Sequence, residues 1–350
     1  MISYILKNGG ILKYINIPDY ENDGYSFFNP SVCVIDDKLI YSIRSANYDM
    51  ILRNNFLQLT PLADKISSRL YIFDNVDNPV AKQVIDSNYK GNDFMSGVED
   101  CRLFEYNGDL YGQCSIGIPR GEMKIQVFKF NFQETNITYE ECLNIIDQNF
   151  NSIEKNWMYI PGTNFEFIYW LNNYKIIYNN NQYTIDSIGN GDFNLNNLRG
   201  SSKLVRYKDG YLCLAHNSQR EVSNISGYDD LRYNNYLLFL NKDLDIEKVS
   251  PNISFSNSFG SQFAPGLEIF NNKVYITFSV LDCAPFELSF DIELLDSIFE
   301  QQQLFEVVNE DDFTKFITTK NIDTYYYKDF FKELNNNSLV RTLESIIKNK

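Results

Sequence analysis

The chain has 350 residues, of which 44% are hydrophobic and 15% aromatic. This is enough apolar material for one large domain or two ordinary ones, so an intrinsically disordered chain is excluded. The net charge of −15 argues against nucleic acid as a partner, because binding to phosphate backbones needs a basic surface. Any phosphate that the protein binds must therefore meet a local cluster of cations.

The chain contains six cysteines, without a Cys-x-x-Cys pair, and a single histidine, His216. This pattern favours neither a metal site nor a disulfide framework, and nothing in the sequence indicates a cofactor. The N-terminus, MISYILKNGGILKY, is too weakly apolar for a signal peptide and too short for a membrane span. We therefore expect a cytoplasmic protein without metal or cofactor. Its oligomeric state is left open, with a homo-oligomer among the alternatives.

One β-hairpin pattern recurs along the chain: an apolar strand, a turn rich in Asp, Asn or Gly, and a second apolar strand. The clearest copy lies in GVEDCRLFEYNGDLYG, where the turn Asn107-Gly108 separates two apolar strands. In chain order, the five predicted turns are Asp36-Asp37, Asn107-Gly108, Asn172-Asn173, Asp209-Gly210 and Asn271-Asn272.

Five similar hairpins with variable segments between them are typical of a β-propeller in which each blade is a small antiparallel sheet. We therefore predict an all-β chain that folds as a five-bladed β-propeller over residues 1–295. A β-sandwich or another all-β fold is the alternative. Residues 296–350 have a different pattern, with Leu339 and Leu343 at helical spacing behind Ser338. For them we predict a short helical C-terminal extension packed on the propeller.

Polar residues stand immediately before or after these otherwise apolar hairpins. In a propeller the innermost strands line a central funnel, so residues at these places converge from different blades. We therefore expect any chemistry to occur in the funnel. In chain order the positions include Asn29, Arg44, Glu99-Asp100, Arg102, Glu154 to Trp157, Arg199 to Lys203, His216, Glu268 and Asp282.

The order of these motifs resembles that of the β-mannoside phosphorylase family, a group of five-bladed β-propellers that also contains β-mannosidases and related β-mannosyltransferases. The resemblance extends from Asn29 to Asp282 and depends on the order of the motifs rather than on any single one. The motifs are an acidic pair before an arginine (Glu99-Asp100 and Arg102), Lys155-Asn156-Trp157, a Gly-Ser stretch that leads into the hairpin ending at His216, and Asp282 after the last hairpin.

The sequence also departs from the family pattern. Cys101 stands where a proline is usual after the acidic pair, and Asn217 follows the histidine where a glycine is usual. One of the arginines expected after the second hairpin has no clear counterpart. These departures leave the fold prediction intact, and they bear on the substrate and the type of reaction.

The resemblance implies an enzyme of inverting glycosyl transfer, with mannose as the expected sugar. The sugar would pass to or from phosphate, a sugar phosphate or a nucleotide sugar, and a mannoside or another glycan would be the second substrate. Asp100 is then the acid that protonates the leaving oxygen, directly or through a sugar hydroxyl. The alternative is that Asp100 forms a structural salt bridge with Arg102 that locks the blade.

A phosphate nucleophile is already anionic and needs cations that position it rather than a general base. The predicted phosphate ligands are Arg44, Arg102, Arg120, Lys155 and His216, and the predicted sugar ligands are Asn29, Glu99, Asn156, Trp157, Ser201, Glu268 and Asp282. Taken singly, Lys155 or Arg120 fits a solvated surface cation and His216 fits a hydrogen-bonded structural group, so only the set is informative. Trp157, with Tyr159 and Phe28, would give an apolar platform for a pyranose ring unless these rings belong to the core.

Two other functions fit the same scaffold. A hydrolase needs a second carboxylate across the sugar to activate water, for which Glu268 is the candidate. Lys155 and Arg120 count against a hydrolase, because water needs no cationic cradle. A glycan-binding propeller without catalysis is the remaining alternative, supported by Cys101 and by the missing arginine.

Overall fold

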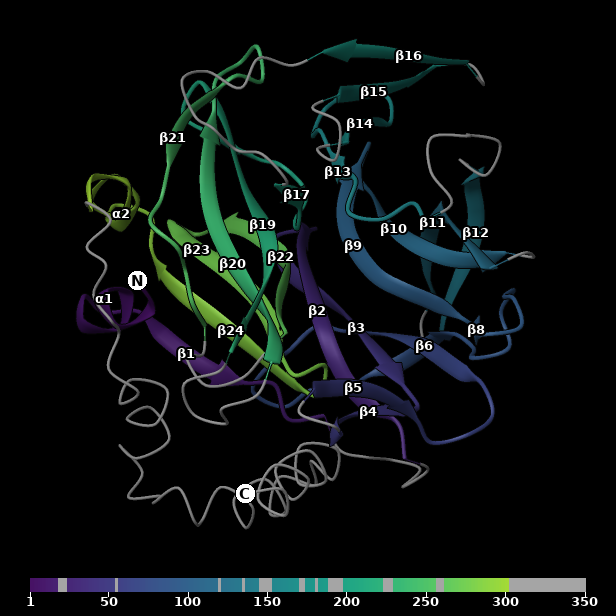
Figure 1. The fold of residues 1–350 in the computed structure, drawn as a ribbon. Helices are drawn as coiled ribbons and strands as arrows, with labels where there is room; N and C mark the ends of the chain where they lie inside the picture. The colour runs from purple at the N-terminus through teal and green to yellow at the C-terminus, as the bar shows by residue number, and fades with distance from the viewer. Residues whose placement is uncertain are drawn as a thin grey trace.

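The computed structural model describes residues 1–17, 24–53, 56–118, 121–133, 136–144, 153–169, 174–179, 182–187, 198–222, 229–255 and 261–301. In these ranges the regular secondary structure is almost entirely β, arranged as five mainly antiparallel sheets around a common axis (Figure 1). The predicted all-β fold and the five-bladed propeller are confirmed.

Each blade is an antiparallel sheet whose strands follow one another outward from the axis. The innermost strands of blades 1 to 5 are β2 (Ser26–Ile35), β9 (Val98–Tyr106), β13 (Met158–Tyr159), the pair β17 (Arg199–Gly200) and β18 (Val205–Tyr207), and β22 (Gln262–Phe270). The outer strands are β3 (Lys38–Ala46), β6 (Ile66–Phe73) and β7 (Lys82–Ile85) in blade 1, with β8 (Met95–Ser96) parallel to β6; β10 (Asp109–Ile118), β11 (Glu122–Gln133) and β12 (Asn136–Asn144) in blade 2; β14 (Glu166–Tyr169), β15 (Tyr174–Asn179) and β16 (Gln182–Ser187) in blade 3; β19 (Gly210–Val222), β20 (Asp229–Leu240) and β21 (Ile246–Val249) in blade 4; and β23 (Lys273–Val280) and β24 (Ala284–Asp291) in blade 5.

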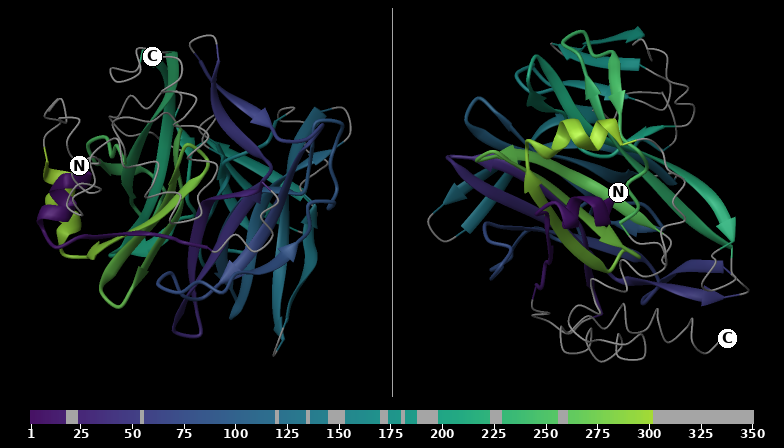
Figure 2. Two further views of the ribbon diagram at one scale, coloured as in Figure 1. Left: turned by 90° about the horizontal axis from the view of Figure 1, so that it is seen from below. Right: turned by 90° about the vertical axis from the view of Figure 1, so that its left-hand side faces the viewer.

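The N-terminus closes the ring, which the sequence did not lead us to expect. Strand β1 (Ile11–Tyr14) pairs antiparallel with β24 and becomes the outermost strand of blade 5. Helix α1 (Ile2–Lys7) lies beside helix α2 (Leu294–Glu300) on the flank of blades 4 and 5 (Figure 2). Tyr4 of α1 donates a hydrogen bond to Ser297 of α2 at 3.1 Å. Both ends of the described chain are thus anchored on the same blade.

The hydrophobic core is divided among the interfaces between neighbouring blades rather than gathered at one centre. Separate clusters lie between blades 1 and 2, 2 and 3, 3 and 4, and 4 and 5. A further cluster fills blade 1 on the side of blade 5, where Tyr41 donates a hydrogen bond to Glu287 at 2.6 Å. Since each blade buries its two faces against its neighbours, the strands read as nearly continuous apolar runs.

Three of the predicted turns are confirmed in detail. Asp36-Asp37, Asn107-Gly108 and Asn271-Asn272 each join two paired strands, and all six residues have positive φ angles between 49° and 82°. Two-residue hairpin loops require this left-handed backbone because it matches the twist of the strands. Asn, Asp and Gly tolerate it better than other residues.

The other two predicted turns need correction. The fourth turn is Lys208-Asp209 rather than Asp209-Gly210, because Gly210 already pairs with Tyr207 as the first residue of β19. A Cβ atom on Gly210 would lie 2.1 Å from the carbonyl oxygen of Leu240, so this glycine serves a close approach between strands. The third hairpin joins β14 to β15, one strand farther from the axis than the others, and its turn lies outside the described residues.

The predicted C-terminal extension begins with α2, whose first residue precedes the predicted boundary at 295/296 by two positions. Leu295 and Ile298 of α2 are fully buried against blade 5. Residues 302–350, including the helix expected behind Ser338, lie outside the described residues, so their packing stays a prediction. Of the helices in the described ranges, none has the length and apolar character needed to span a lipid bilayer.

A hairpin inserted into blade 1 reaches across to blade 4. It consists of β4 (Tyr48–Arg53) and β5 (Phe56–Pro61) and leaves the blade between β3 and β6. Phe56 pairs in parallel with Asp229 at the start of β20, so the hairpin extends the sheet of blade 4 (Figure 1). The hairpin therefore links two blades that are not neighbours in the ring.

The closure of the ring by the N-terminal segment can be tested with two matched substitutions. Ile5→Ala removes a side chain that is fully buried between the helices and blade 5, and it should lower the free energy of unfolding by about 2–5 kcal/mol. Ile11→Ala removes the same atoms from a position that is 46% exposed, and it should cost less than about 1 kcal/mol. Chemical denaturation of both variants measures the difference. Equal losses would show that α1 does not anchor the propeller.

Candidate active site

Three of the innermost strands are interrupted by a β-bulge at the end away from their hairpin turns. In β2, β9 and β22, two residues oppose one on the neighbouring strand, at Asn29-Pro30, Asp100-Cys101 and Ala264-Pro265. A bulge bends the strand and re-aims a side chain, and proline is accepted there because the ladder is already interrupted. The bulges therefore bring Asn29 and Asp100 to the same end of the funnel.

Polar residues from four blades meet at this end on left-handed backbone. The φ angle is +50° at Asn29, +49° at Asp100, +65° at Asn156 and +50° at Asp282. Asn and Asp enter this region of backbone space more readily than other residues with a Cβ atom. We call the group that gathers here the mouth cluster; its members are Asn29, Arg44, Glu99, Asp100, Arg102, Lys155, Asn156 and Asp282.

Arg44 is the central cation of the mouth cluster. Its guanidinium donates to Glu99 at 2.8 Å and to Asp100 at 3.3 Å, and its Nε donates to Ser68 at 3.1 Å. Lys155 donates to the second oxygen of Glu99 at 2.6 Å. Glu99 is thus held between two cations, while Asp100 retains one oxygen outside its contacts with Arg44 and Asn29.

These cations favour the ionised forms of both acids. Burial alone would raise the pKa of Asp100, but Arg44 and then Lys155 outweigh burial, and the pKa is lowered. The pKa of Glu99 is lowered against burial by the same two residues. The side chain of Asp100 is 13% exposed and that of Glu99 is 9% exposed. Asp100 is therefore an ionised carboxylate in the resting site and the more accessible of the two.

Asn29 orients Asp100. Its Nδ2 donates to Asp100 Oδ1 at 2.8 Å, and its Oδ1 accepts a hydrogen bond from Ser279 of blade 5. Both ends of the amide are thus engaged within the protein. Although we predicted Asn29 as a sugar ligand, the contacts favour a residue that positions the carboxylate.

Arg102 fastens three blades together instead of pairing with the carboxylate of Asp100. Its guanidinium donates to the backbone oxygen of Asp100 at 2.9 Å, to Asn156 at 2.8 Å and to the backbone oxygen of Ser201. It is 1% exposed and faces the ring of Phe263. The alternative of a salt bridge between Asp100 and Arg102 is therefore wrong. The carboxylate of Asp100 pairs with Arg44 instead.

His216 lies beside the mouth cluster as a neutral ring. Ser201 Oγ and His216 Nδ1 are 2.8 Å apart, and the imidazole stacks on Tyr233. Burial, followed by the charges of Arg199 and Arg102, lowers the pKa of His216 to about 3. His216 is therefore neutral in the resting site, so its predicted role as a phosphate ligand would depend on hydrogen bonds rather than on charge. A neutral imidazole retains its capacity for hydrogen bonds.

Asp282 has the opposite titration behaviour to Asp100. It follows β23, and its Oδ2 accepts a hydrogen bond from Tyr48 at 3.0 Å. Burial, followed by the charge of Asp100, raises the pKa of Asp282 to about 6. Two carboxyl groups whose environments push their pKa values apart are an arrangement that suits division into acid and base.

Two predicted site residues, Glu268 and Trp157, lie away from the mouth cluster. Glu268 lies near the hairpin turn of blade 5, where it accepts hydrogen bonds from Lys203 at 2.7 Å and from the backbone of Val34 at 3.1 Å. Trp157 is fully buried between blades 2 and 3, with its Nε1 bonded to Glu154, so its ring offers no free face to a sugar. Arg120 lies outside the described residues.

Two residues of the site were assigned no role from the sequence. Tyr48 belongs to the inserted hairpin, which has no counterpart in the repeated pattern, so no signal pointed to it. Arg199 was placed among the polar residues expected at the funnel but was not assigned to a ligand, although its charge was a signal. Within the described ranges, no group of three or more His, Cys, Asp and Glu side chains has an arrangement that would hold a metal ion.

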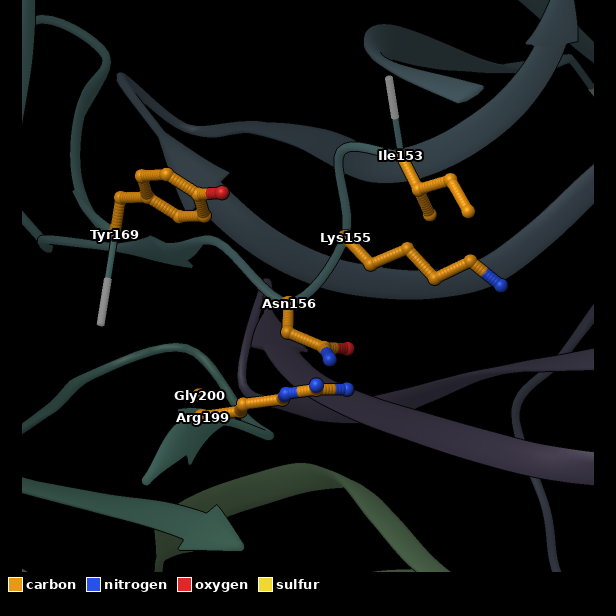
Figure 3. Close-up of a pocket in the computed structure, with 6 residues that line it drawn as sticks. All are labelled: Ile153, Lys155, Asn156, Tyr169, Arg199 and Gly200. Atoms are coloured by element: carbon orange, nitrogen blue, oxygen red, sulfur yellow. The ribbon is translucent and has the colours of Figure 1, made fainter. Parts of the chain in front are cut away.

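A pocket of about 220 Å³ opens beside the mouth cluster, between blades 3 and 4. Lys155, Asn156 and Arg199 extend into it in a common direction (Figure 3). The other lining residues are Ile153, Tyr169 and Gly200. Lys155 belongs both to the pocket and to the carboxylate network, so a molecule in the pocket would lie next to Glu99.

Structural comparison finds this fold in solved mannoside phosphorylases and glycoside hydrolases. A β-1,2-mannobiose phosphorylase from Listeria innocua, in complex with β-1,2-mannobiose, aligns with a TM-score of 0.55 and 13% identity, over 83% of this chain and 99% of that chain. The chain has the fold of the mannoside phosphorylases. A glycosyl hydrolase from Bacteroides ovatus aligns with a TM-score of 0.50 and 14% identity, over 77% and 85% of the two chains.

A third structure comes from work on glycoside hydrolases within the GH130 family of mannoside phosphorylases that target β-1,2-mannosidic linkages in Candida mannan. It aligns with a TM-score of 0.50 and 12% identity, over 80% of this chain and 94% of that chain. No protein-family model matches the sequence, and no curated protein matches it. At these identities the likeness establishes a common fold, and the activity has to be argued from the site.

The raised pKa of Asp282 predicts a pH-dependent gain in stability for Asp282→Asn. In the unfolded chain the group ionises near pH 4, whereas in the folded protein it ionises near pH 6, so the wild type loses stability as the pH rises through this window. Asparagine carries no charge to bury. At pH 7 to 8 the variant should therefore be more stable by about 1–3 kcal/mol, and the difference should vanish towards pH 4. Denaturation of both proteins across this range measures it, and a variant less stable at pH 8 would contradict the assignment.

Proposed function

We propose that the protein is an inverting enzyme of glycosyl transfer that moves a sugar, in the first instance mannose, between an acceptor and phosphate or a phosphate-bearing donor. Asp100 acts as the general acid or base, and a mannoside or another glycan is the second substrate. The observation that carries the proposal is the placement of Asp100 at the mouth of the funnel, beside a pocket whose lining contains cations and no carboxylate.

The ionised resting state of Asp100 supports catalysis in the direction of glycoside synthesis. In that direction an acceptor hydroxyl attacks the anomeric carbon from the face opposite the leaving phosphate, the carbon–oxygen bond to phosphate breaks, and the proton of the hydroxyl passes to Asp100. In phosphorolysis the same group gives the proton back to the leaving oxygen. An anionic substrate beside Lys155 would offset part of the positive charge and raise the pKa of Asp100, which favours this second direction.

The supporting residues can be given separate tasks. Arg44 and Asn29 orient Asp100, and Glu99 keeps Lys155 in place for an anion. Arg102 joins the blades that carry these groups. Of the predicted sugar ligands, Asp282 and Asn156 remain the strongest candidates, because the hydrogen bonds among the described residues engage only one polar atom of each side chain. Both ends of the Asn29 amide are engaged, the hydroxyl of Ser201 lies against His216, and Trp157 is buried.

A hydrolase is the second candidate, favoured by one observation. Asp282 has a pKa near 6 and stands in the electrostatic field of Asp100, as a base that activates water requires, whereas Glu268 lies away from the mouth cluster. Incubation of the enzyme with mannose 1-phosphate or a nucleotide-linked mannose and a panel of sugar acceptors separates the candidates. Release of mannose to water without phosphate dependence would favour the hydrolase, and the absence of any product with every donor and acceptor would reject both.

Asp100→Asn tests the central assignment. The amide keeps the shape and the contact with Asn29 but cannot exchange the proton, so kcat for glycosyl transfer should fall by about 10²- to 10⁴-fold. The melting temperature should stay within a few degrees of the wild type. Asp109→Asn is the matched control, because Asp109 lies on the same blade at the opposite end and makes an exposed ion pair with Lys129. Full activity in Asp100→Asn would mean that the acidic pair is structural.

Lys155→Ala separates the anion site from the acid. Loss of the ammonium removes one cation from the pocket and leaves Glu99 paired with Arg44 alone. We expect the KM for phosphate or the phosphosugar to rise by about ten-fold or more, with a smaller fall in kcat at saturation. Steady-state kinetics in both substrates measures this. An unchanged KM for the anion with an altered KM for the acceptor would reverse the two subsites.

A further inference from the structure

The pocket between blades 3 and 4 offers only hydrogen-bond donors on its charged side. Lys155 uses one of its three N–H groups on Glu99 and remains 34% exposed. Asn156 has its Oδ1 occupied by Arg102, which leaves its Nδ2 as the group to serve a ligand. Both side chains extend alongside Arg199 (Figure 3). Such a set recognises an oxyanion rather than a neutral hydroxyl network.

Arg199 is a cation of the pocket that takes no part in the ion pairs of the mouth cluster. It is exposed at the rim of the pocket, and none of the ion pairs formed among the residues that the structure describes includes it. Its backbone is fixed by the pairing of β17 with β19, where Arg199 stands opposite His216. A chain of net charge −15 repels anions at long range, so an unpaired arginine on a fixed strand next to Lys155 is a local device for binding one.

The pocket is larger than a small ion needs. Its volume of about 220 Å³ is more than ten times the space of roughly 10–15 Å³ that one ordered water requires. Ile153 stands on its wall with 55% of its surface exposed, so the pocket also presents an apolar surface to a ligand. The apolar face of a pyranose ring is a suitable cover, whereas inorganic phosphate is not.

We propose that this pocket is a subsite for a charged sugar acceptor, in which Arg199 and Asn156 bind an oxyanion carried by the sugar and Ile153 contacts its ring, while Lys155 serves the phosphate of the reaction. The oxyanion is a phosphate ester or a carboxylate, since both offer the same acceptor oxygens to a guanidinium. The inference rests on the proposed function, for which it names the class of the second substrate. Arg199 then selects a charged acceptor over a neutral one.

Binding measurements test this without turnover. Titration calorimetry would use mannose 6-phosphate and glucuronate as charged sugars, with mannose and inorganic phosphate as controls. The proteins would be the wild type, Arg199→Gln, Arg199→Lys and Arg206→Gln. Arg206 is the matched control because it is an exposed arginine of the same blade whose guanidinium faces Pro161, away from the pocket.

Loss of one charge-assisted contact should weaken the binding of the charged sugar by about 10- to 100-fold in Arg199→Gln. Arg199→Lys should retain part of the affinity, Arg206→Gln should match the wild type, and binding of mannose should not change in any variant. Added salt should weaken the binding of the charged sugar more in the wild type than in Arg199→Gln. The tighter of the two charged sugars identifies the oxyanion as phosphate ester or carboxylate.

Three results would overturn the inference: no binding of either charged sugar to the wild type, equal binding to the wild type and Arg199→Gln, or a loss of inorganic phosphate binding in Arg199→Gln as large as that of the charged sugar. Repeating the titrations with Asp100→Asn separates this inference from the proposed function. If the charged sugar binds through Arg199 but no glycosyl transfer occurs in the wild type, the subsite stands and the proposed reaction fails. If transfer occurs equally with neutral acceptors in Arg199→Gln, the reaction stands and the subsite fails.

Discussion

The structure depends on the pairing of β1 with β24, which turns a row of sheets into a closed ring. Four residue pairs, from Ile11 with Ser289 to Tyr14 with Phe286, join segments from the two ends of the described chain. Closure matters for the site because the mouth cluster draws its members from different blades. Asn29, Asp100 and Asp282 face one another only when blade 5 stands against blade 1. The hydrogen bond from Tyr41 to Glu287 and the contact of Asn29 with Ser279 act across this same junction.

Within the closed ring, the two buried arginines of the mouth cluster have different roles. Arg102 is the more deeply buried arginine and binds backbone and amide oxygens, so it fixes geometry. Arg44 binds two carboxylates and therefore sets their ionisation. This leaves Lys155 and Arg199 at the solvent side as the cations that can meet a substrate. The arrangement resolves how a strongly acidic chain can serve anionic ligands, because its cations are concentrated where the acids are already neutralised.

The sequence predicted the blades better than it predicted their closure. Turn residues such as Asp36-Asp37 and Asn107-Gly108 are of types that accept positive φ angles, so the hairpins could be identified from the local sequence. The pairing of β1 with β24 is a long-range contact with no local signature. For the site, the pattern located Asp100, Arg44 and Lys155, which the structure brings together. Glu268 and Trp157 were misplaced because sequence position before a strand does not say which end or face of the blade a side chain occupies. The titration of His216 depends on burial, which no motif reports.

The left-handed backbone at Asn29, Asp100, Asn156 and Asp282 has a consequence for how such a site can diverge. A residue with a larger or branched side chain pays a steric cost at these positions, so the substitutions that preserve the fold are largely exchanges among Asn, Asp and Gly. An Asp and an Asn differ by one nucleotide change in their codons and by a full unit of charge in the site. The backbone thus limits the residue types that these positions accept. Each accepted substitution changes the charge or the length of a site side chain and leaves the propeller fold unchanged. A single Asp-to-Asn or Asn-to-Asp replacement at one of these positions would therefore change the charge of the site while the backbone conformation is kept.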